Sequence, residues 1–186
     1  MTSLGFTLPA WVEERIAVER VLATDQARMA FAVALARENV LRGGGPFGAV
    51  VLERASGRVV AAGVNLVVPE RSSLLHAEVV AVLAAQRALG GYSLRDAALP
   101  EHELVASCDP CAMCLGATLW SGVRRLVCGA ARADAEAVGF DEGPVFDASY
   151  AYLEERGIEV VRGVLREEAA AVLVEYAEGG GPVYND

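Results

Sequence analysis

The chain has 186 residues, 54% of them hydrophobic and 22% charged, which is enough for one compact domain with a buried core. Its formal net charge is −9, and all 16 basic residues are arginine. An acidic chain without lysine is a poor match for phosphate backbones, so we expect no nucleic-acid partner. The absence of lysine also excludes a lysine Schiff base as the catalytic device.

Hydropathy and cysteine usage indicate where the protein is located and what its cysteines do. The sequence contains no run of about 18 apolar residues and no basic-then-apolar start, so we expect a cytoplasmic protein without a membrane partner. Its four cysteines suit metal-binding or structural thiols better than a disulfide framework. Three of them fall at 108, 111 and 114, whereas Cys128 lies in an apolar stretch and is interpreted as a small buried hydrophobe.

The predicted elements begin after residues 1–23, which show no clean period and are expected to pack as an N-terminal arm. From Thr24 to about Leu41 apolar residues recur at helical spacing, with a cap at Thr24 or Asp25. Two β-rich runs follow, at 49–53 and 58–64. The short Ala-Ser-Gly connection between these runs predicts an antiparallel hairpin.

Strands and helices alternate in the rest of the chain, which predicts an α/β sandwich with right-handed crossovers. The predicted elements are a helix at 74–89, a strand at 104–107, a helix at 111–120, a strand at 125–128, a helix at 148–156, a strand at 158–165 and a helix at 167–175. The domain is expected to span 24–177. A glycine-rich tail, 178–186, then ends the chain.

The sharpest motif pairs His76-Ala-Glu78 with Pro110-Cys111-Ala-Met-Cys114. This pattern matches the H-x-E and P-C-x-x-C signature of zinc deaminases. Asp109 as a cap and Pro110 as a first residue would start a helix there, which places both cysteines on one face of its first turn. The positive end of that helix favours the thiolates that zinc requires.

His76 as the third ligand leaves one tetrahedral position for water, which is the arrangement of a catalytic zinc site. Two thiolates balance the charge of the ion, so the water is acidified less than at an all-histidine site and needs a base nearby. Glu78 is the candidate base. It would accept the water proton and return it to a ring nitrogen of the substrate.

Plainer interpretations stay open at this point. Cys108 could close the zinc site as a fourth ligand, and His76 with Glu78 could be an ordinary exposed helix start. A Cys-x-x-Cys pair alone would suggest redox chemistry, although no thioredoxin-like surroundings are evident. The remaining histidine, His102, stands between acidic residues and is expected on the surface rather than in the site.

At these residues the sequence resembles the cytidine-deaminase-like superfamily and, within it, the bacterial guanine deaminases, some of which also deaminate the triazine ammeline. The resemblance runs from about 24 to 184. Its motifs are Gly44-Gly-Pro-Phe-Gly-Ala49, Asn65, the stretch from Ser107 to Gly116, and Glu136-Ala-Val-Gly-Phe-Asp-Glu-Gly-Pro144. It implies a three-layer α/β/α sandwich with a central mixed five-stranded sheet and one Zn²⁺ per subunit.

The resemblance also implies further site residues. Asn65 would bind the base and Phe47 would enclose it, as suits an amide that both donates and accepts and an aromatic face. Ala77 would also contact the substrate, and Glu142 would help to deliver a proton to the departing ammonia. The plainer alternatives are a turn residue for Asn65, core packing for Phe47 and a solvated loop for Glu142.

The relatives are expected to form homodimers in which a C-terminal tyrosine closes the partner's pocket, and Tyr184 occupies that place here. A terminus without fixed structure is the alternative. The implied activity is hydrolysis of a C–N bond in a cyclic amidine: guanine would give xanthine and ammonia within purine metabolism, with ammeline or related triazines as further substrates. Cytosine analogues, isoguanine or another modified base are alternatives, and so is a zinc-stabilised interaction module without activity.

Overall fold

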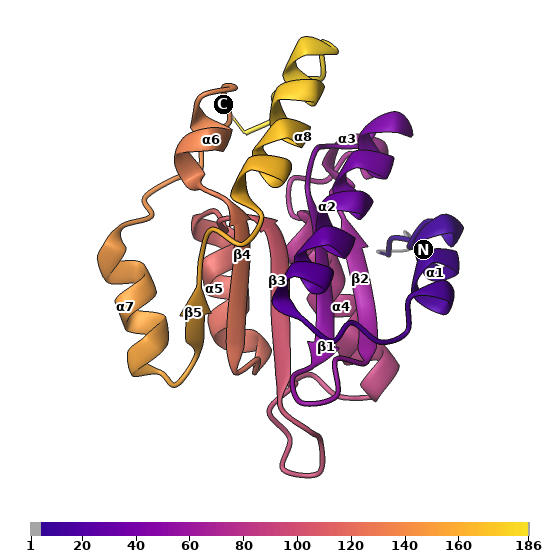
Figure 1. Ribbon diagram of the computed structural model, residues 1–186, viewed down its shortest axis with the longest axis vertical. Coiled ribbons are helices and arrows are strands. Elements are labelled where there is room, and N and C mark those ends of the chain that lie inside the picture. Colours follow the sequence, from indigo (N-terminus) through magenta and orange to yellow (C-terminus); the bar gives the residue numbers. More distant parts are fainter. Residues whose placement is uncertain (1–4, 186) are drawn as a thin grey trace.

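A five-stranded mixed sheet runs through the centre of the structure, a computed structural model in which residues 5–185 are described (Figure 1). Its strand order is β2-β1-β3-β4-β5. β1 pairs antiparallel with both β2 and β3, while β3, β4 and β5 are parallel. The strands are β1 (Gly48–Glu53), β2 (Val59–Val64), β3 (His102–Cys108), β4 (Arg125–Ala130) and β5 (Glu159–Val161).

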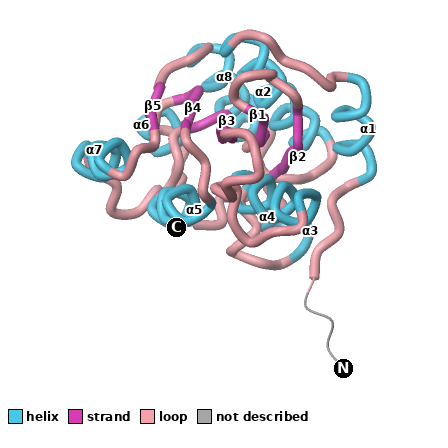
Figure 2. The backbone as a smooth tube through the Cα atoms, turned by 90° about the horizontal axis from the view of Figure 1, so that it is seen from below, coloured by secondary structure: helices cyan, strands magenta, loops and turns pink. Residues whose placement is uncertain are grey.

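Helices cover both faces of the sheet, and Figure 2 shows them above and below the strands. α2 and α8 lie on one face, while α4 and α5 lie on the other. The helices are α1 (Ala10–Val18), α2 (Asp25–Leu41), α3 (Val67–Glu70), α4 (Ala77–Leu89), α5 (Ala112–Ser121), α6 (Arg132–Glu136), α7 (Asp147–Glu155) and α8 (Arg166–Glu178). The predicted three-layer sandwich with a mixed five-stranded sheet is therefore confirmed. None of the helices within residues 5–185 is long and apolar enough to cross a bilayer.

The two layers of helices create two hydrophobic clusters, one on each side of the sheet. Neighbouring residues of β3 belong to different clusters, because successive side chains of a strand point to opposite faces of the sheet. Val105 joins the cluster that contains Phe31 of α2, and Leu104 joins the cluster that contains Ala81 of α4. Because both faces of the sheet are covered, the central strands β3 and β4 are buried along their whole length.

Most of the expected elements are present, with shifts at their ends. The helix cap at Thr24 is confirmed, since its hydroxyl accepts a hydrogen bond from the amide of Ala27 at 3.2 Å. The expected arm contains helix α1, whose Val12 is fully buried. The last strand is shorter than predicted and stops at Val161, and the short helices α3 and α6 were not expected. Residues 1–4 and Asp186, the extreme ends of the expected arm and tail, lie outside the described residues.

The prediction of a surface position for His102 is wrong. His102 is fully buried at the start of β3, where its ring Nδ1 lies 3.3 Å from the carbonyl oxygen of Leu94. The acidic neighbours in the sequence suggested solvent, yet Glu103 is also fully buried. Burial of that carboxylate is possible because arginines from two other elements reach it.

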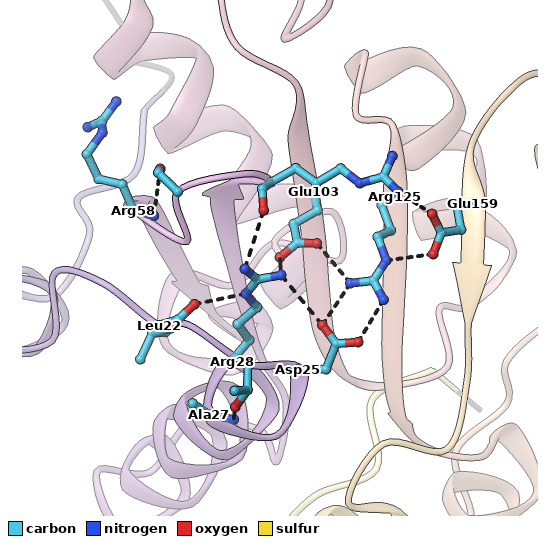
Figure 3. Close-up of polar contacts among 11 residues, drawn as sticks. Leu22, Asp25, Ala27, Arg28, Arg58, Glu103, Arg125 and Glu159 are labelled. Carbon is cyan, nitrogen blue, oxygen red and sulfur yellow. Dashed lines mark hydrogen bonds and ion pairs between the residues drawn. The ribbon is translucent and has the colours of Figure 1, made fainter.

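These arginines form a charge network at the edge of the sheet where β3, β4 and β5 begin (Figure 3). Glu103 lies between Arg28 and Arg125, with nitrogen–oxygen distances of 2.8 and 3.0 Å. Arg125 also binds Asp25 through both guanidinium terminal nitrogens, at 2.8 and 2.7 Å, and Glu159 at 3.0 Å. The network therefore joins α2 to three strands at the end of the sheet opposite Cys108.

At that opposite edge, one glycine determines how closely α4 approaches the sheet. Gly63 of β2 lies directly under the first turns of α4, and a Cβ there would collide with the backbone of Ala77 and Ala81. A glycine at this position lets the helix pack backbone to backbone on the strand. The start of α4, with His76 just before it, is thereby held at the edge of the sheet.

Candidate active site

Residues from four separate segments meet at one edge of the sheet. β3 and β4 end there, and β1 begins there because Ala49 pairs with Ala106 near the end of β3. The antiparallel hairpin brings the end of β2 to the same edge, since Gly48 pairs with Val64. In open α/β sheets ligands bind outside the carboxyl ends of the parallel strands. The register therefore predicts a shared site for the side chains that flank these strand ends.

The three candidate metal ligands converge at this edge. Nδ1 of His76 lies 3.5 Å from Sγ of Cys111 and 3.6 Å from Sγ of Cys114. All three ligand atoms lie within 4.8 Å of one another. The helix begins at Ala112 with Cys111 as its N-cap, so the prediction of Asp109 as the cap and Pro110 as the first helical residue is wrong by two positions. The side chain of Asp109 instead binds Arg162 and the amide of Arg132.

The spacing of these atoms fits a zinc ion. Zinc bonds of about 2.3 Å to sulfur and about 2.0–2.1 Å to nitrogen, at tetrahedral angles, separate the two donors by roughly 3.6 Å. The two measured nitrogen–sulfur distances match this value. One imidazole and two thiols are also the donor set of catalytic zinc sites that keep a position for water.

Cys108 does not join this cluster. Its thiol lies 3.9 Å from the carbonyl oxygen of Ala131, and it is absent from the set of potential ligands found within residues 5–185. The closed four-ligand alternative is therefore not supported. Cys128 is fully buried in β4, as predicted for a small hydrophobic residue.

The protonation of the thiols depends on their contacts. The hydrogen bond from Cys114 lowers the pKa of Cys111 to about 4, with further help from His76. The same hydrogen bond and burial hold the pKa of Cys114 well above its ordinary value. The protein alone thus favours one thiolate of the pair, and a bound cation is what favours the second.

Two buried carboxyl groups flank the ligands. Glu78, in the first turn of α4, is 8% exposed and lines the same cavity as His76 and Cys111. Burial, followed by the charge of Cys111, raises the pKa of Glu78. Glu142 is 5% exposed, and the same two causes raise its pKa to about 8. The solvated-loop alternative for Glu142 is therefore wrong.

A small cavity connects these groups. Its volume is about 10 Å³, about the space of one water molecule, and it is lined by Phe47, His76, Glu78, Asp109, Cys111, Glu142 and Asn185. Larger hollows lie elsewhere on the surface, but they do not contain the metal-ligating cluster. The cavity combines an aromatic wall with several groups that can transfer protons, which is the lining expected of a catalytic pocket.

Asn65 follows β2 and is fully buried beside this region. Its side-chain oxygen Oδ1 accepts a hydrogen bond from the backbone amide of Val67 at 3.2 Å. This oxygen therefore has the turn-forming contact of the plainer interpretation. Its Nδ2 is buried without a hydrogen-bond partner, which leaves a donor available to a ligand. Gly45 allows this arrangement, because a Cβ there would collide with the Tyr184 hydroxyl and crowd Oδ1 of Asn65.

The C-terminal tail packs against the same chain's site. The ring of Tyr184 meets that of Phe140 edge-on at 5.2 Å, and Phe140 meets Phe47 in the same way at 5.1 Å. Asn185 Nδ2 donates to the carbonyl oxygen of Asp141 at 2.6 Å. The Tyr184 hydroxyl is buried without a partner. These contacts lie within one chain, and exchange of the tail between subunits stays a prediction.

The structure therefore brings the three metal ligands together with both glutamates, and places Asn65 next to Phe47; the roles of these residues stay predictions. Ala77 is buried as the first residue of α4, next to His76. Sequence reasoning missed Asn185, which lines the cavity, and it gave Asp109 the wrong contacts. The only signal for Asn185 was its position beside Tyr184 in the tail.

A three-layer α/β sandwich that presents one histidine, two cysteines and a buried glutamate at a small cavity defines a class of enzyme. It is the class of zinc-dependent hydrolases that remove amino groups from heterocyclic rings.

Comparison with known proteins gives the family. The sequence model of the cytidine and deoxycytidylate deaminase zinc-binding region matches residues 22–130. The guanine deaminase of Bacillus subtilis (strain 168) is 39% identical over 137 residues, 73% of this chain and 83% of that protein. The solved guanine deaminase from Nitrosomonas europaea is 47% identical with a TM-score of 0.91, covering 95% of this chain and 97% of that one. The solved structure of NE0047 in complex with 2,6-diaminopurine is 48% identical to this chain, with a TM-score of 0.92. The similarity covers 98% of this chain and 97% of that one. The chain therefore belongs to the cytidine and deoxycytidylate deaminase zinc-binding family and is a zinc-dependent hydrolase of carbon–nitrogen bonds.

Proposed function

We propose that the chain hydrolyses guanine to xanthine and ammonia. The observation that carries this proposal is the placement of two buried carboxyl groups, Glu78 and Glu142, in one cavity with zinc ligands, together with the free Asn65 amide donor next to Phe47 of the same cavity. The choice of guanine is supported by the near full-length similarity to a guanine deaminase and to a relative solved with a diaminopurine.

When bound to His76, Cys111 and Cys114, zinc supplies a Lewis acid that lowers the pKa of a water molecule and so makes it nucleophilic at neutral pH. Glu78 accepts a proton from the water as its oxygen attacks C2 of guanine, the carbon that bears the amino group. The same carboxyl then transfers this proton to the neighbouring ring nitrogen, so that C2 becomes tetrahedral. Its position in the first turn of α4, two residues after His76, keeps Glu78 beside the ligands.

The other residues bind the ring and assist departure of ammonia. Asn65 donates from Nδ2 to an acceptor on the purine edge, and Phe47 packs against the ring face. Glu142 has a pKa of about 8 in the protein alone and can therefore hold a proton near neutral pH. It donates that proton to the amino group, and the C–N bond breaks to release ammonia while Glu78 accepts the proton of the C2 hydroxyl, which becomes the carbonyl group of xanthine. Transfer of this proton from Glu78 to Glu142 through solvent restores both carboxyl groups. Ala77, which follows His76, and Tyr184, whose ring packs on Phe140, complete the proposed set of substrate contacts.

The test is ammonia release from guanine, ammeline, cytosine, isoguanine and adenine. Glu78→Gln keeps the shape of the side chain but removes the base, and we expect at least a 100-fold loss of kcat, in line with the usual contribution of about 10²–10⁴ from acid–base catalysis. Zinc content should not change. The matched control is Glu70→Gln, because Glu70 is exposed on α3. Equal rates from Glu78→Gln and the wild type would remove Glu78 from the mechanism.

The same panel separates the alternative functions. Preference for ammeline, isoguanine or a cytosine analogue over guanine would replace the proposed substrate but keep the reaction. Zinc binding without ammonia from any of the five bases would favour the interaction module. A tRNA adenosine deaminase would need a basic face for RNA, which a chain of net charge −9 without lysine does not favour.

We also propose that the enzyme is a homodimer that acts in purine metabolism in the cytoplasm. An apolar surface supports self-association: Trp120 is 79% exposed, Phe146 65% and Tyr152 49%. Beside them a hollow runs between α5 and α7, and α5 carries no charged residue. Exposed apolar patches of this kind mark interfaces. Exchange of the tail would keep the Tyr184 and Asn185 contacts but make them between subunits.

A further inference from the structure

Asp109 is a buried carboxylate at the junction between β3 and the metal-binding helix. Its side chain is 1% exposed, and its amide donates to the carbonyl oxygen of Ala130 at 2.8 Å, which extends the β3–β4 ladder by one residue. Only Pro110 separates it from Cys111. Because proline restricts the backbone of the preceding residue, the orientation of Asp109 sets the direction in which the chain leaves the strand toward Cys111.

Arg162 holds this carboxylate from a distant part of the chain. It follows β5, and its Nε donates to Oδ1 of Asp109 at 3.1 Å while its Nη2 binds Oδ2. The amide of Arg132 donates to Oδ2 at 3.2 Å. The guanidinium carbon of Arg162 also lies 4.3 Å from the ring centroid of Tyr150 on α7, a cation–π contact. The arginine is therefore fixed on one side by an aromatic ring and on the other by a two-pronged ion pair.

We infer that Arg162 is a positioning residue for the zinc site: through Asp109 it fixes the loop that carries Cys111, and thereby controls how tightly the metal is held. The inference rests on the proposed zinc ligands. The proposed mechanism uses neither residue, and Arg162 does not line the catalytic cavity.

The physical reason is the location of Asp109 among other acidic groups. The cavity that it lines also contains Glu78, Glu142 and Cys111. Without Arg162 the buried carboxylate of Asp109 would lose its ion-pair partner. This loss strongly favours a rearrangement that brings water or another cation to the carboxylate. Such a rearrangement moves the residue two positions before a ligand. Loss of a partner that orients metal ligands usually lowers metal affinity or activity about 10–100-fold.

The experiment measures zinc release from the purified holoenzyme to an excess of a coloured chelator. We expect Arg162→Gln to release zinc about 10–100-fold faster than the wild type. Arg162→Lys should fall between the two, because an ammonium lacks the planar fork that binds both carboxylate oxygens. The matched control is Arg166→Gln. Arg166 forms a similar two-pronged pair with Asp134, at 2.9 Å on both sides, but that pair does not line the cavity.

A double-variant comparison tests the route through Asp109. In an Asp109→Asn background, addition of Arg162→Gln should change zinc release less than about 2-fold, because the two residues act as one unit. With saturating zinc, Arg162→Gln should lower kcat and leave KM for guanine near that of the wild type. The melting temperature of each variant, measured with zinc, shows whether faster release reflects general instability.

The outcomes distinguish the inference from the function on which it rests. A wild-type protein without stoichiometric zinc, or one whose zinc is unaffected by Cys111→Ser, would overturn the proposed site itself. Equal zinc release from the wild type and Arg162→Gln, in a wild type that does hold zinc, would overturn the role of Arg162. The full effect of Arg162→Gln persisting in Asp109→Asn would overturn the route through Asp109.

Discussion

Replacement of Arg125 by methionine tests whether the buried charge network stabilises the fold. The variant leaves Glu103, which is fully buried, with Arg28 alone, and it removes the contacts of Arg125 to Asp25 and Glu159. Breaking a buried ion pair from one side costs about 3–5 kcal/mol. The contacts to Asp25 and Glu159, whose side chains are 31% and 46% exposed, add little because exposed pairs contribute about 0–1 kcal/mol each.

The expected loss for Arg125→Met is therefore about 3–5 kcal/mol of unfolding free energy, or a decrease of roughly 6–20 °C in melting temperature for a chain of this size. Urea unfolding at one fixed zinc concentration measures it, since bound metal shifts apparent stability. Arg37→Met is the matched control: Arg37 pairs with Glu175 at 2.9 Å, but both side chains are 43–50% exposed. Its cost should stay within about 1 kcal/mol.

Activity provides the second half of the same test. The network lies where β3, β4 and β5 begin, whereas the zinc ligands lie beyond the opposite ends of these strands, so kcat of folded Arg125→Met should stay near the wild-type value (Figure 3). Two results would refute the reasoning. One is a destabilisation no larger than that of Arg37→Met, and the other is a loss of kcat at a temperature where the variant is fully folded.

Three further predictions follow from the described contacts. Chelation of zinc should abolish ammonia release and make the thiols of Cys111 and Cys114 reactive toward a thiol reagent, and added zinc should reverse both changes. Trp120→Glu should weaken self-association at least about 10-fold in sedimentation velocity, because a charge would replace an exposed aromatic anchor; an unchanged dimer would exclude this face. The hydrogen bond from Arg125 lowers the pKa of Asp25 below 3.8, so its stabilising contribution is present above that value and is lost as the pH falls through the folded-state pKa. Asp25→Asn should therefore flatten the acid limb of a plot of urea midpoint against pH, and an unchanged limb would contradict this assignment.

The sequence predicts elements well where the signal is local. All five strands and the helices α2, α4, α5, α7 and α8 follow from periodicity, caps and turn residues. Helix α1 lacked a clean apolar period and was not predicted, since only Val12 of its residues is buried. α3 and α6 have four and five residues, too few to show a helical period.

The burial of polar residues was the main failure, and its cause is long-range. Glu103 and His102 look like surface residues in the sequence because their neighbours are acidic. The burial of Glu103 depends on Arg28 and Arg125, which come from other elements and could not be paired with Glu103 from one sequence. The same limit explains Asp109: its expected role as a helix cap is local, whereas its partner Arg162 follows β5.

The metal motif shows why the site was easier to predict than its surroundings. His76, Cys111 and Cys114 combine residue types that have few other reasons to occur at this spacing, so their chemistry identifies them without any knowledge of packing. Phe47, Asn65 and Glu142 are common residue types and required the resemblance to a family. In the structure Phe47 and Glu142 line the cavity, and the backbone amide of Asn65 donates to the carbonyl oxygen of Phe47 at 3.1 Å.

The two ends of the sheet differ in how their buried carboxyl groups are compensated, although Nε2 of His102, where β3 begins, is also buried without a hydrogen-bond partner. At the end where β3 begins, arginines pair with the buried Glu103. At the other end the Asn65 amide nitrogen and the Tyr184 hydroxyl are buried without partners, and burial raises the pKa of Glu142 to about 8. Unpartnered groups destabilise a free protein, but a cation and a planar ring with hydrogen-bonding edges would satisfy them. Folding alone therefore does not explain why these polar groups are buried without partners. The binding of zinc and a nucleobase explains it.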